Sequence, residues 1–291
     1  MNTINRMSGS CNKMPYIAVD EDVSIYVEDI GSETGAKDVL KPVLFVHGWP
    51  LSHEMFEYQY MALHKNGYRC IGMDLRGFGR SDKPWTRYNY DVFADDIKQV
   101  ISMLNLQGIT LVGFSMGGAI VMHYVAKYFS ELVSKVVLMG AAAPCFTKRE
   151  DYPYGLEKSV CDDLIMKSKQ DRPKMVSDFA KMFFRNENSQ SKEMLQWLFS
   201  INMEVSPFAT VKCLEELRDA DLRNDMQVLN QRNLPVAIFH GTHDKICPFD
   251  FAKVMNEGIK GSRLIEFHES GHGLNIEEKD KINEELRKFI G

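Results

Sequence analysis

Short runs of apolar residues recur along the chain and alternate with longer amphipathic segments. An apolar run of about four residues, bounded by polar or turn-forming residues, is typical of a strand buried on both faces of a sheet. Such runs lie at residues 43–46, 70–73, 110–112, 136–139 and 236–239, and a further strand is predicted at 24–29. Apolar positions at helical spacing predict helices near residues 92–104 and at the end of the chain. This alternation predicts an α/β fold with a mostly parallel central sheet flanked by helices.

The alternation of strands and helices breaks off between residues 144 and 225. This segment is helical in composition, contains several prolines and aromatic residues, and lacks a clear buried strand. We therefore predict a helical cap at 144–225, inserted into a core made of residues 17–143 and 226–291. Residues 1–16 are predicted to be a flexible tail, and the polar stretch at 31–41 an extended turn.

The composition narrows the classes of function. Of the 291 residues, 44% are apolar and 26% are charged, which is ordinary for a globular protein with a buried core. The net charge of −5 gives no basic surface for binding nucleic acid or an anionic membrane. A small neutral or apolar substrate fits this chain better.

Six cysteines are spread over the chain without the spacing of a zinc site. We interpret them as reduced thiols of a cytoplasmic protein that holds no metal. The first fourteen residues lack the apolar segment of a secretory signal. Residues 109–126 contain no Asp, Glu, Lys or Arg, but three glycines interrupt this run. We therefore expect a buried strand followed by a helix rather than a membrane span.

The sequence Gly-Phe-Ser-Met-Gly at 113–117 matches the G-x-S-x-G motif of a serine nucleophile. It follows a predicted strand and precedes a predicted helix at 116–128, which is the context that the motif requires. The glycines allow a tight turn in which flanking side chains would collide with the neighbouring backbone. Ser115 is therefore predicted to be the nucleophile.

A serine hydroxyl needs a base, and the base needs a group that fixes its tautomer. In α/β-hydrolases the acid and the histidine follow the serine in that order along the chain. Asp244 and His272 both follow predicted strands, at the sheet edge where ligands bind in open α/β folds. We predict them as the partners of Ser115, with Asp250 and His268 as their nearest rivals.

Two backbone N–H groups are predicted to form an oxyanion hole. One belongs to Met116, at the start of a helix, where the N–H is free and the helix dipole favours negative charge. The other belongs to Trp49, in the sequence His-Gly-Trp-Pro that ends the second predicted strand. Pro50 has no N–H, but it restricts the backbone of the residue before it. His47 is predicted to be a packing residue, and the glycine-containing segment at 74–82 a structural turn.

Together these motifs resemble the α/β-hydrolase superfamily. Four segments resemble more closely the cofactor-free, non-haem bacterial haloperoxidases and their arylesterase relatives: residues 45–52, 73–85, 88–96 and 111–118. The resemblance implies a serine esterase acting on small aryl or short-chain esters, with perhydrolase side activity in which hydrogen peroxide replaces water. It implies no cofactor. Members described as haloperoxidases tend to carry a proline at the position of Pro50. The resemblance also implies a substrate pocket formed by Pro50, Phe146, Phe179, Phe183, Leu217, Ile246 and Cys247.

Other functions use the same fold. A carbon-carbon bond hydrolase or a lactonase would use the same three residues under a cap of a different shape. A ligand-binding receptor with a slow triad is the alternative from another class. The departure of Leu217 and Cys247 from bulkier or branched residues leaves the pocket shape open. The sequence also leaves open whether the chain forms a homo-oligomer.

Overall fold

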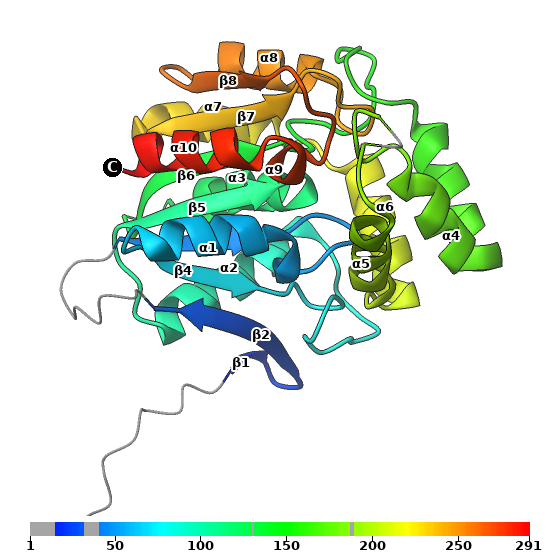
Figure 1. Ribbon diagram of the computed structural model, residues 1–291, viewed down its shortest axis with the longest axis horizontal. Coiled ribbons are helices and arrows are strands. Elements are labelled where there is room, and N and C mark those ends of the chain that lie inside the picture. The colour runs from blue at the N-terminus through cyan, green and yellow to red at the C-terminus, as the bar shows by residue number, and fades with distance from the viewer. Residues whose placement is uncertain (1–14, 32–40, 130, 187–188) are drawn as a thin grey trace, which may run out of the picture.

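A computed structural model describes residues 15–31, 41–129, 131–186 and 189–291, and over these residues the chain forms an eight-stranded sheet (Figure 1). The strand order is β1-β2-β4-β3-β5-β6-β7-β8. Strands β1 and β2 pair antiparallel, as do β2 and β4, and all other neighbours are parallel. The bounds are β1 Tyr16–Asp20, β2 Val23–Ile30, β3 Pro42–Val46, β4 Arg69–Met73, β5 Ile109–Phe114, β6 Val133–Met139, β7 Val236–Gly241 and β8 Arg263–Phe267.

The predicted fold class is confirmed. Each of the predicted apolar runs lies inside a strand. The parallel strands β3, β5 and β7 are buried along their whole length, which is why their sequences are apolar throughout. Strand β1 was not among the predicted strands. This short edge strand has one buried residue and otherwise exposed or half-buried ones, so it carries no apolar run.

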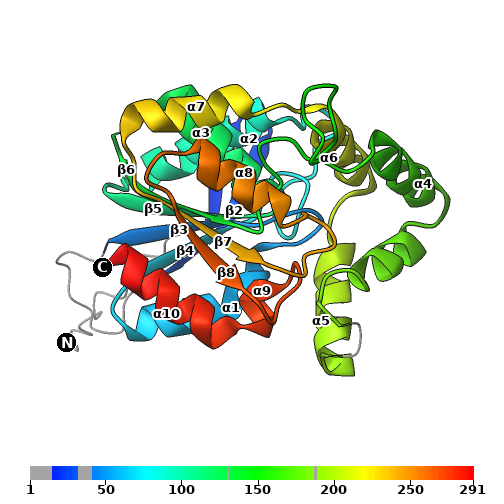
Figure 2. The same cartoon turned by 90° about the horizontal axis from the view of Figure 1, so that it is seen from above.

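Helices cover both faces of the sheet (Figure 2). One face carries α1 (Glu57–Lys65), α9 (Leu274–Glu277) and α10 (Lys279–Ile290). The other carries α2 (Tyr90–Met103), α3 (Met116–Tyr128), α7 (Arg223–Arg232) and α8 (Asp250–Gly258). The uncharged run at 109–126 consists of β5 and most of α3, both buried. No helix in the described residues is long and apolar enough to span a membrane.

Three further helices gather beyond the carboxyl ends of the parallel strands: α4 (Lys158–Ala180), α5 (Lys192–Met203) and α6 (Pro207–Asp219). Helix α4 is broken by non-helical torsion angles at Asp171, just before Pro173. We propose that α4 to α6 form the cap. Helix α7 starts at Arg223 and packs on α3, so the boundary expected at residue 225 falls inside a helix of the core.

Some sequence expectations concern residues outside the described part. The predicted tail lies almost wholly there, as do Cys11 and residues 32–40 of the predicted turn. The five cysteines that the structure describes are buried and unpaired with one another.

Candidate active site

Ser115 lies in the turn between β5 and α3. Its φ of 54° and ψ of −120° are unfavourable for a residue with a side chain, and its N–H donates to the Met139 carbonyl at 2.9 Å. Two glycines permit so tight a turn. A Cβ at Gly117 would lie 2.2 Å from the Val46 oxygen, and one at Gly113 would lie 2.4 Å from the Gly117 oxygen. Because backbone atoms approach these two positions so closely, only glycine fits at residues 113 and 117.

Asp244 and His272 meet across the ends of β7 and β8. Gly241 pairs with Phe267 in these strands, so the two following loops start level with each other. Nδ1 of His272 lies 2.7 Å from Oδ2 of Asp244. Because a carboxylate only accepts hydrogen bonds, Nδ1 carries the hydrogen, and in the neutral ring Nε2 is free to accept a proton.

The other oxygen of Asp244 is held by the backbone. Its Oδ1 accepts hydrogen bonds from the N–H groups of Ile246 and Cys247, both at 2.8 Å. Burial alone would raise the pKa of Asp244, but the charge of His272 and hydrogen bonds from His240 and His272 hold that pKa well below its usual range. Asp244 is therefore an ionised carboxylate with a fixed orientation at neutral pH.

The neighbouring histidines do not assemble a metal site. Among the described residues, no group of three or more His, Cys, Asp or Glu side chains could hold a metal ion. Nε2 of His240 donates to the Cys247 carbonyl at 2.8 Å and lies 3.4 Å from Oδ2 of Asp244. His240 thus contacts both the Asp244 carboxylate and the Cys247 carbonyl.

The loop that carries His272 is tied to the segment after α4. The imidazole packs edge-on against the Phe183 ring, with 5.6 Å between the ring centroids. The Glu277 carboxylate accepts one hydrogen bond from Gly271 N–H at 2.7 Å and another from Arg185 N–H at 2.8 Å. One carboxylate therefore fixes both the histidine loop and the neighbouring segment.

The loop that carries Trp49 and the helix that starts at Met116 both lie next to Ser115. Trp49 is in the loop after β3, and Met116 is the first residue of α3. The loop approaches the elbow closely, because a Cβ at Gly48 would lie 2.7 Å from the Ser115 Cβ. Neither the Trp49 nor the Met116 N–H makes a hydrogen bond within the part of the chain that the structure describes. Both groups are therefore available to a ligand.

The Trp49 loop is anchored at its start by His47. Nε2 of His47 accepts a hydrogen bond from Leu75 N–H at 3.0 Å, and Nδ1 donates to the Gly48 carbonyl at 2.8 Å. Burial lowers the pKa of His47 to about 4, so the ring is neutral at physiological pH. Both ring nitrogens are engaged, which leaves neither for catalysis.

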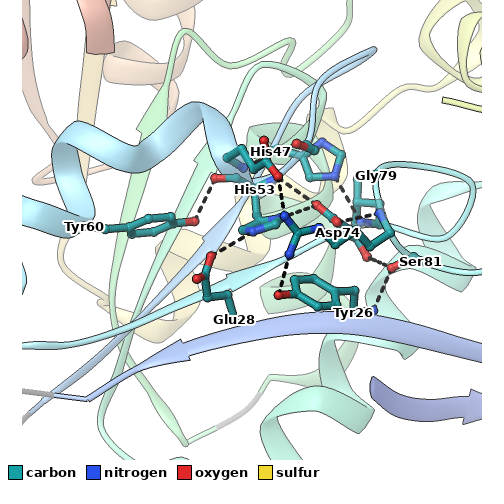
Figure 3. A network of polar contacts seen from close by, with 12 residues as sticks. Tyr26, Glu28, His47, His53, Tyr60, Asp74, Gly79 and Ser81 are labelled. Atoms are coloured by element: carbon teal, nitrogen blue, oxygen red, sulfur yellow. Dashed lines mark hydrogen bonds and ion pairs between the residues drawn. The ribbon is translucent and has the colours of Figure 1, made fainter. Parts of the chain in front are cut away.

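A second buried histidine anchors the end of the loop (Figure 3). The backbone N–H and Nδ1 of His53 lie 2.8 Å and 2.7 Å from Oδ1 of Asp74, and its Nε2 lies 3.0 Å from Glu28. Burial alone would lower the pKa of His53, but the hydrogen bonds with Asp74 and Glu28 raise it to about 9. Asp74 also accepts from Arg80 N–H at 2.9 Å. The turn at 74–82 thus anchors the loop that carries Trp49.

We expect this histidine to make stability depend on pH. Its pKa is raised on folding, so its contribution is complete below pH 6.5 and is lost as the pH rises through about 9. The shift corresponds to at most about 3 kcal/mol. His53→Gln should therefore unfold more easily than the native protein at pH 6.5, and the difference should shrink towards pH 10. Urea unfolding at a series of pH values measures this difference.

His123→Gln is the matched control. Hydrogen bonds that His123 donates to Asp225 and Asp91 raise the pKa of His123 as well. His123 lies on α3, far along the sequence from the Trp49 loop. The stability of His123→Gln should still fall as the pH rises through about 9, because His53 is unchanged in this variant. Parallel stability curves for His53→Gln and the native protein would contradict the assignment.

A narrow apolar cavity lies over Ser115. Of the residues predicted to form the pocket, four line this cavity: Phe146, Phe179, Leu217 and Ile246. Pro50 and Phe183 instead line a second cavity, which shares Trp49 and Phe179 with the first. Cys247 is fully buried and lines neither of the two cavities. Among the described residues, the Ser115 hydroxyl makes no hydrogen bond with His272.

Sequence reasoning missed two residues that line the Ser115 cavity, Leu164 and Leu214. Leu214 lies three residues before Leu217 on α6, so helical spacing could have placed both on one face. Leu164 lies on α4, whose weakly amphipathic sequence offers no comparable signal.

The rival residues are exposed. The Asp250 side chain is 52% accessible and forms an ion pair with Lys253 at 3.0 Å, one turn along α8. The His268 side chain is 66% accessible and lies 3.8 Å from Glu266. Neither takes part in the buried cluster around Asp244 and His272.

The family model described as alpha/beta hydrolase fold matches residues 41–279. The chain belongs to this family. It is 47% identical over 94% of its length to the AB hydrolase superfamily protein YisY of Bacillus subtilis (strain 168), of which 98% is covered. It is 32% identical over 95% of its length to the bifunctional esterase/perhydrolase DCH of Acinetobacter calcoaceticus, of which 99% is covered.

The fold agrees with that of a solved relative. The esterase EaEST from Exiguobacterium antarcticum superposes with a TM-score of 0.88 and is 44% identical, covering 94% of this chain and 98% of its own. Further relatives are named non-heme chloroperoxidase or haloperoxidase. The resemblance to non-haem bacterial haloperoxidases is therefore confirmed, and this chain is an enzyme of the hydrolase class.

Proposed function

We propose that the protein is a serine-triad carboxylic ester hydrolase with perhydrolase side activity. The observation that carries this proposal is the 2.7 Å contact between His272 Nδ1 and the buried Asp244, placed at the same sheet edge as the strained Ser115 turn. The contact fixes the tautomer that a general base requires. The names of the relatives, esterase and perhydrolase among them, agree with the proposal.

In the proposed reaction Ser115 Oγ attacks the ester carbonyl while Nε2 of His272 takes the serine proton. The oxyanion that forms accepts hydrogen bonds from the N–H groups of Trp49 and Met116, which have no other partner in the described residues. His272 then gives the proton to the leaving alcohol, and an acyl-enzyme remains. Water, or hydrogen peroxide in perhydrolysis, loses a proton to His272 and releases the acid or the peracid.

The proposed reaction requires the Ser115 hydroxyl to rotate towards His272. Burial raises the pKa of the Cys247 thiol well above its usual value. The thiol therefore stays neutral and cannot act as a base towards Ser115. A catalytic hydrogen bond that forms only when substrate binds is common in enzymes without ligand.

The cavity favours a small apolar acyl or aryl group. Its walls are apolar, apart from the Ser115 side chain. It shares Phe146, Leu164, Phe179 and Ile246 with a wider groove whose rim carries two aspartates and two lysines. A substrate with an apolar group at Ser115 and a polar end towards the solvent matches this gradient. The five buried, unpaired cysteines fit a reducing compartment such as the cytoplasm.

The proposal is tested by an activity screen over 4-nitrophenyl esters of increasing acyl length, with and without hydrogen peroxide. We expect a burst of 4-nitrophenol followed by steady turnover, fastest with short acyl groups, and peracid as an added product in peroxide. Cleavage of a carbon-carbon bond or a lactone in preference to these esters would favour the alternative hydrolases. A single stoichiometric burst without turnover would favour a receptor.

We expect Pro50→Leu to change the choice of acyl acceptor. Proline fixes its own φ and biases the backbone of Trp49 away from the helical region. It therefore determines where the Trp49 carbonyl points. We propose that this carbonyl accepts a hydrogen bond from hydrogen peroxide. Loss of one such bond, worth about 1 kcal/mol, should lower the ratio of perhydrolysis to hydrolysis roughly fivefold. The ratio is measured as peracid against acid from one ester. The 4-nitrophenol burst should not change, and an unaltered ratio would reduce the proposal to a plain esterase.

A further inference from the structure

The second cavity adjoins the Ser115 cavity at Trp49 and Phe179. Both residues line both cavities, and their rings meet edge to face with centroids 5.0 Å apart. The second cavity is enclosed by the Trp49 loop, the end of α4, the segment that follows α4, and α5. It leaves room for roughly one water-sized molecule. Nine of its ten lining side chains are apolar, and the tenth is the amide of Asn202.

Two polar atoms around this cavity lack a partner. Oδ1 of Asn202 and the indole Nε1 of Trp49 are buried and make no hydrogen bond within the described residues. They are two of six such side-chain atoms in the described chain, yet both belong to residues that line this one cavity. Both residues are 5% exposed. A buried amide or indole without a partner costs free energy, so a ligand that satisfies both atoms would be stabilised there.

The chemistry of the two atoms defines the ligand. The indole N–H only donates and the amide oxygen only accepts, so the matching molecule must offer both an acceptor and an O–H donor. The apolar walls and the small volume limit it to the smallest molecules that carry an O–H group. Water, hydrogen peroxide and methanol meet these conditions, and each can attack an acyl-enzyme.

We propose that this cavity is a binding subsite for the acyl acceptor, with Asn202 and the Trp49 indole as its hydrogen-bonding groups. The inference rests on the proposed function, because it supplies the co-substrate of that reaction. The acceptor passes the Trp49 and Phe179 rings to reach the acylated Ser115. Its oxygen then bonds to the acyl carbon while its proton moves to Nε2 of His272. The bond to Ser115 Oγ breaks, and Oγ takes this proton back.

The test is the dependence of deacylation on acceptor concentration, using 4-nitrophenyl acetate with hydrogen peroxide or with methanol. In the native enzyme, peracid and methyl ester formation should saturate. Asn202→Leu keeps the size of the side chain and removes its polar atoms. It should raise the half-saturating concentration of either acceptor about fivefold, as expected for one lost hydrogen bond. The 4-nitrophenol burst, which reports acylation, should stay unchanged.

Gln196→Met is the matched control, because it also replaces an amide on α5 by an apolar side chain, but at an exposed position that does not line the cavity. It should leave both half-saturating concentrations near the native values. Equal shifts in the two variants would mean that the effect does not come from the cavity, and an unchanged Asn202→Leu enzyme would mean that the cavity holds a permanent water. Either result overturns the inference. If Asn202→Leu fails to fold, Asn202→Ser, which shortens the polar group, should shift the same quantity in the same direction.

The outcomes separate this inference from the proposed function. A normal burst with product formation strictly proportional to acceptor concentration in the native enzyme would overturn the subsite and leave the esterase intact. The absence of any 4-nitrophenol release would overturn the esterase itself.

Discussion

Ser115→Ala should abolish ester hydrolysis while the protein remains folded. The hydroxyl is the only group proposed to form the acyl-enzyme, and its loss should lower kcat by several powers of ten, since the remaining hydrogen-bond donors supply only part of the rate enhancement. Removing one oxygen from the Ser115 side chain creates little empty space. The measurement is steady-state turnover of 4-nitrophenyl acetate together with the melting temperature.

Ser102→Ala is the control for this variant. Ser102 is exposed near the end of α2 and should be replaceable without effect on turnover. A Ser115→Ala enzyme that keeps more than about a tenth of native activity would remove Ser115 from the mechanism, because the loss of a nucleophile costs far more than tenfold. Loss of the burst without loss of folded structure would support the acyl-enzyme.

The parts of the fold that follow from local pattern could be predicted from the sequence. Strands β3, β5 and β7 are buried on both faces, so their sequences are uninterrupted apolar runs. The turn at Ser115 needs glycines on both sides for steric reasons, so it also leaves a local signature. Asp244 and His272 could be proposed because each follows a strand, and the carboxyl ends of parallel strands meet at one edge.

The features that could not be predicted depend on contacts between distant segments. His53 reads as an ordinary loop histidine, and its charge follows only from the approach of Asp74 and Glu28. Asn202 lies within a helix of the proposed cap, where an asparagine usually faces solvent. Only the packing of α5 near the Trp49 loop buries its amide at a cavity that Trp49 also lines. The pattern of apolar and polar residues along the chain does not predict such contacts between distant side chains.

Asp244→Asn should lower kcat by roughly four powers of ten with little change in KM, because an amide in place of Oδ2 can hold His272 in the wrong tautomer. The Asp244 carboxylate also accepts two backbone N–H groups through Oδ1, and an asparagine oriented with its oxygen there would present its NH₂ to Nδ1. Nε2 would then carry the hydrogen and could no longer accept the proton of Ser115. Because Asn fills the same volume, the melting temperature should fall by far less than the activity.

His272→Ala should be impaired to a similar or greater extent, and the exposed rivals supply matched controls. Asp250→Asn and His268→Ala change the same residue types at positions where the side chains lie at the surface. Both should keep near-native kcat and KM. Exogenous imidazole should partly restore the burst in His272→Ala, since the space left beside Phe114 and Phe183 is bounded by aromatic rings that would hold an imidazole in place. The opposite result would be a loss of activity in His268→Ala or Asp250→Asn while Asp244 and His272 tolerated replacement. The catalytic role would then belong to the exposed residue, and the 2.7 Å contact between His272 and Asp244 would be structural.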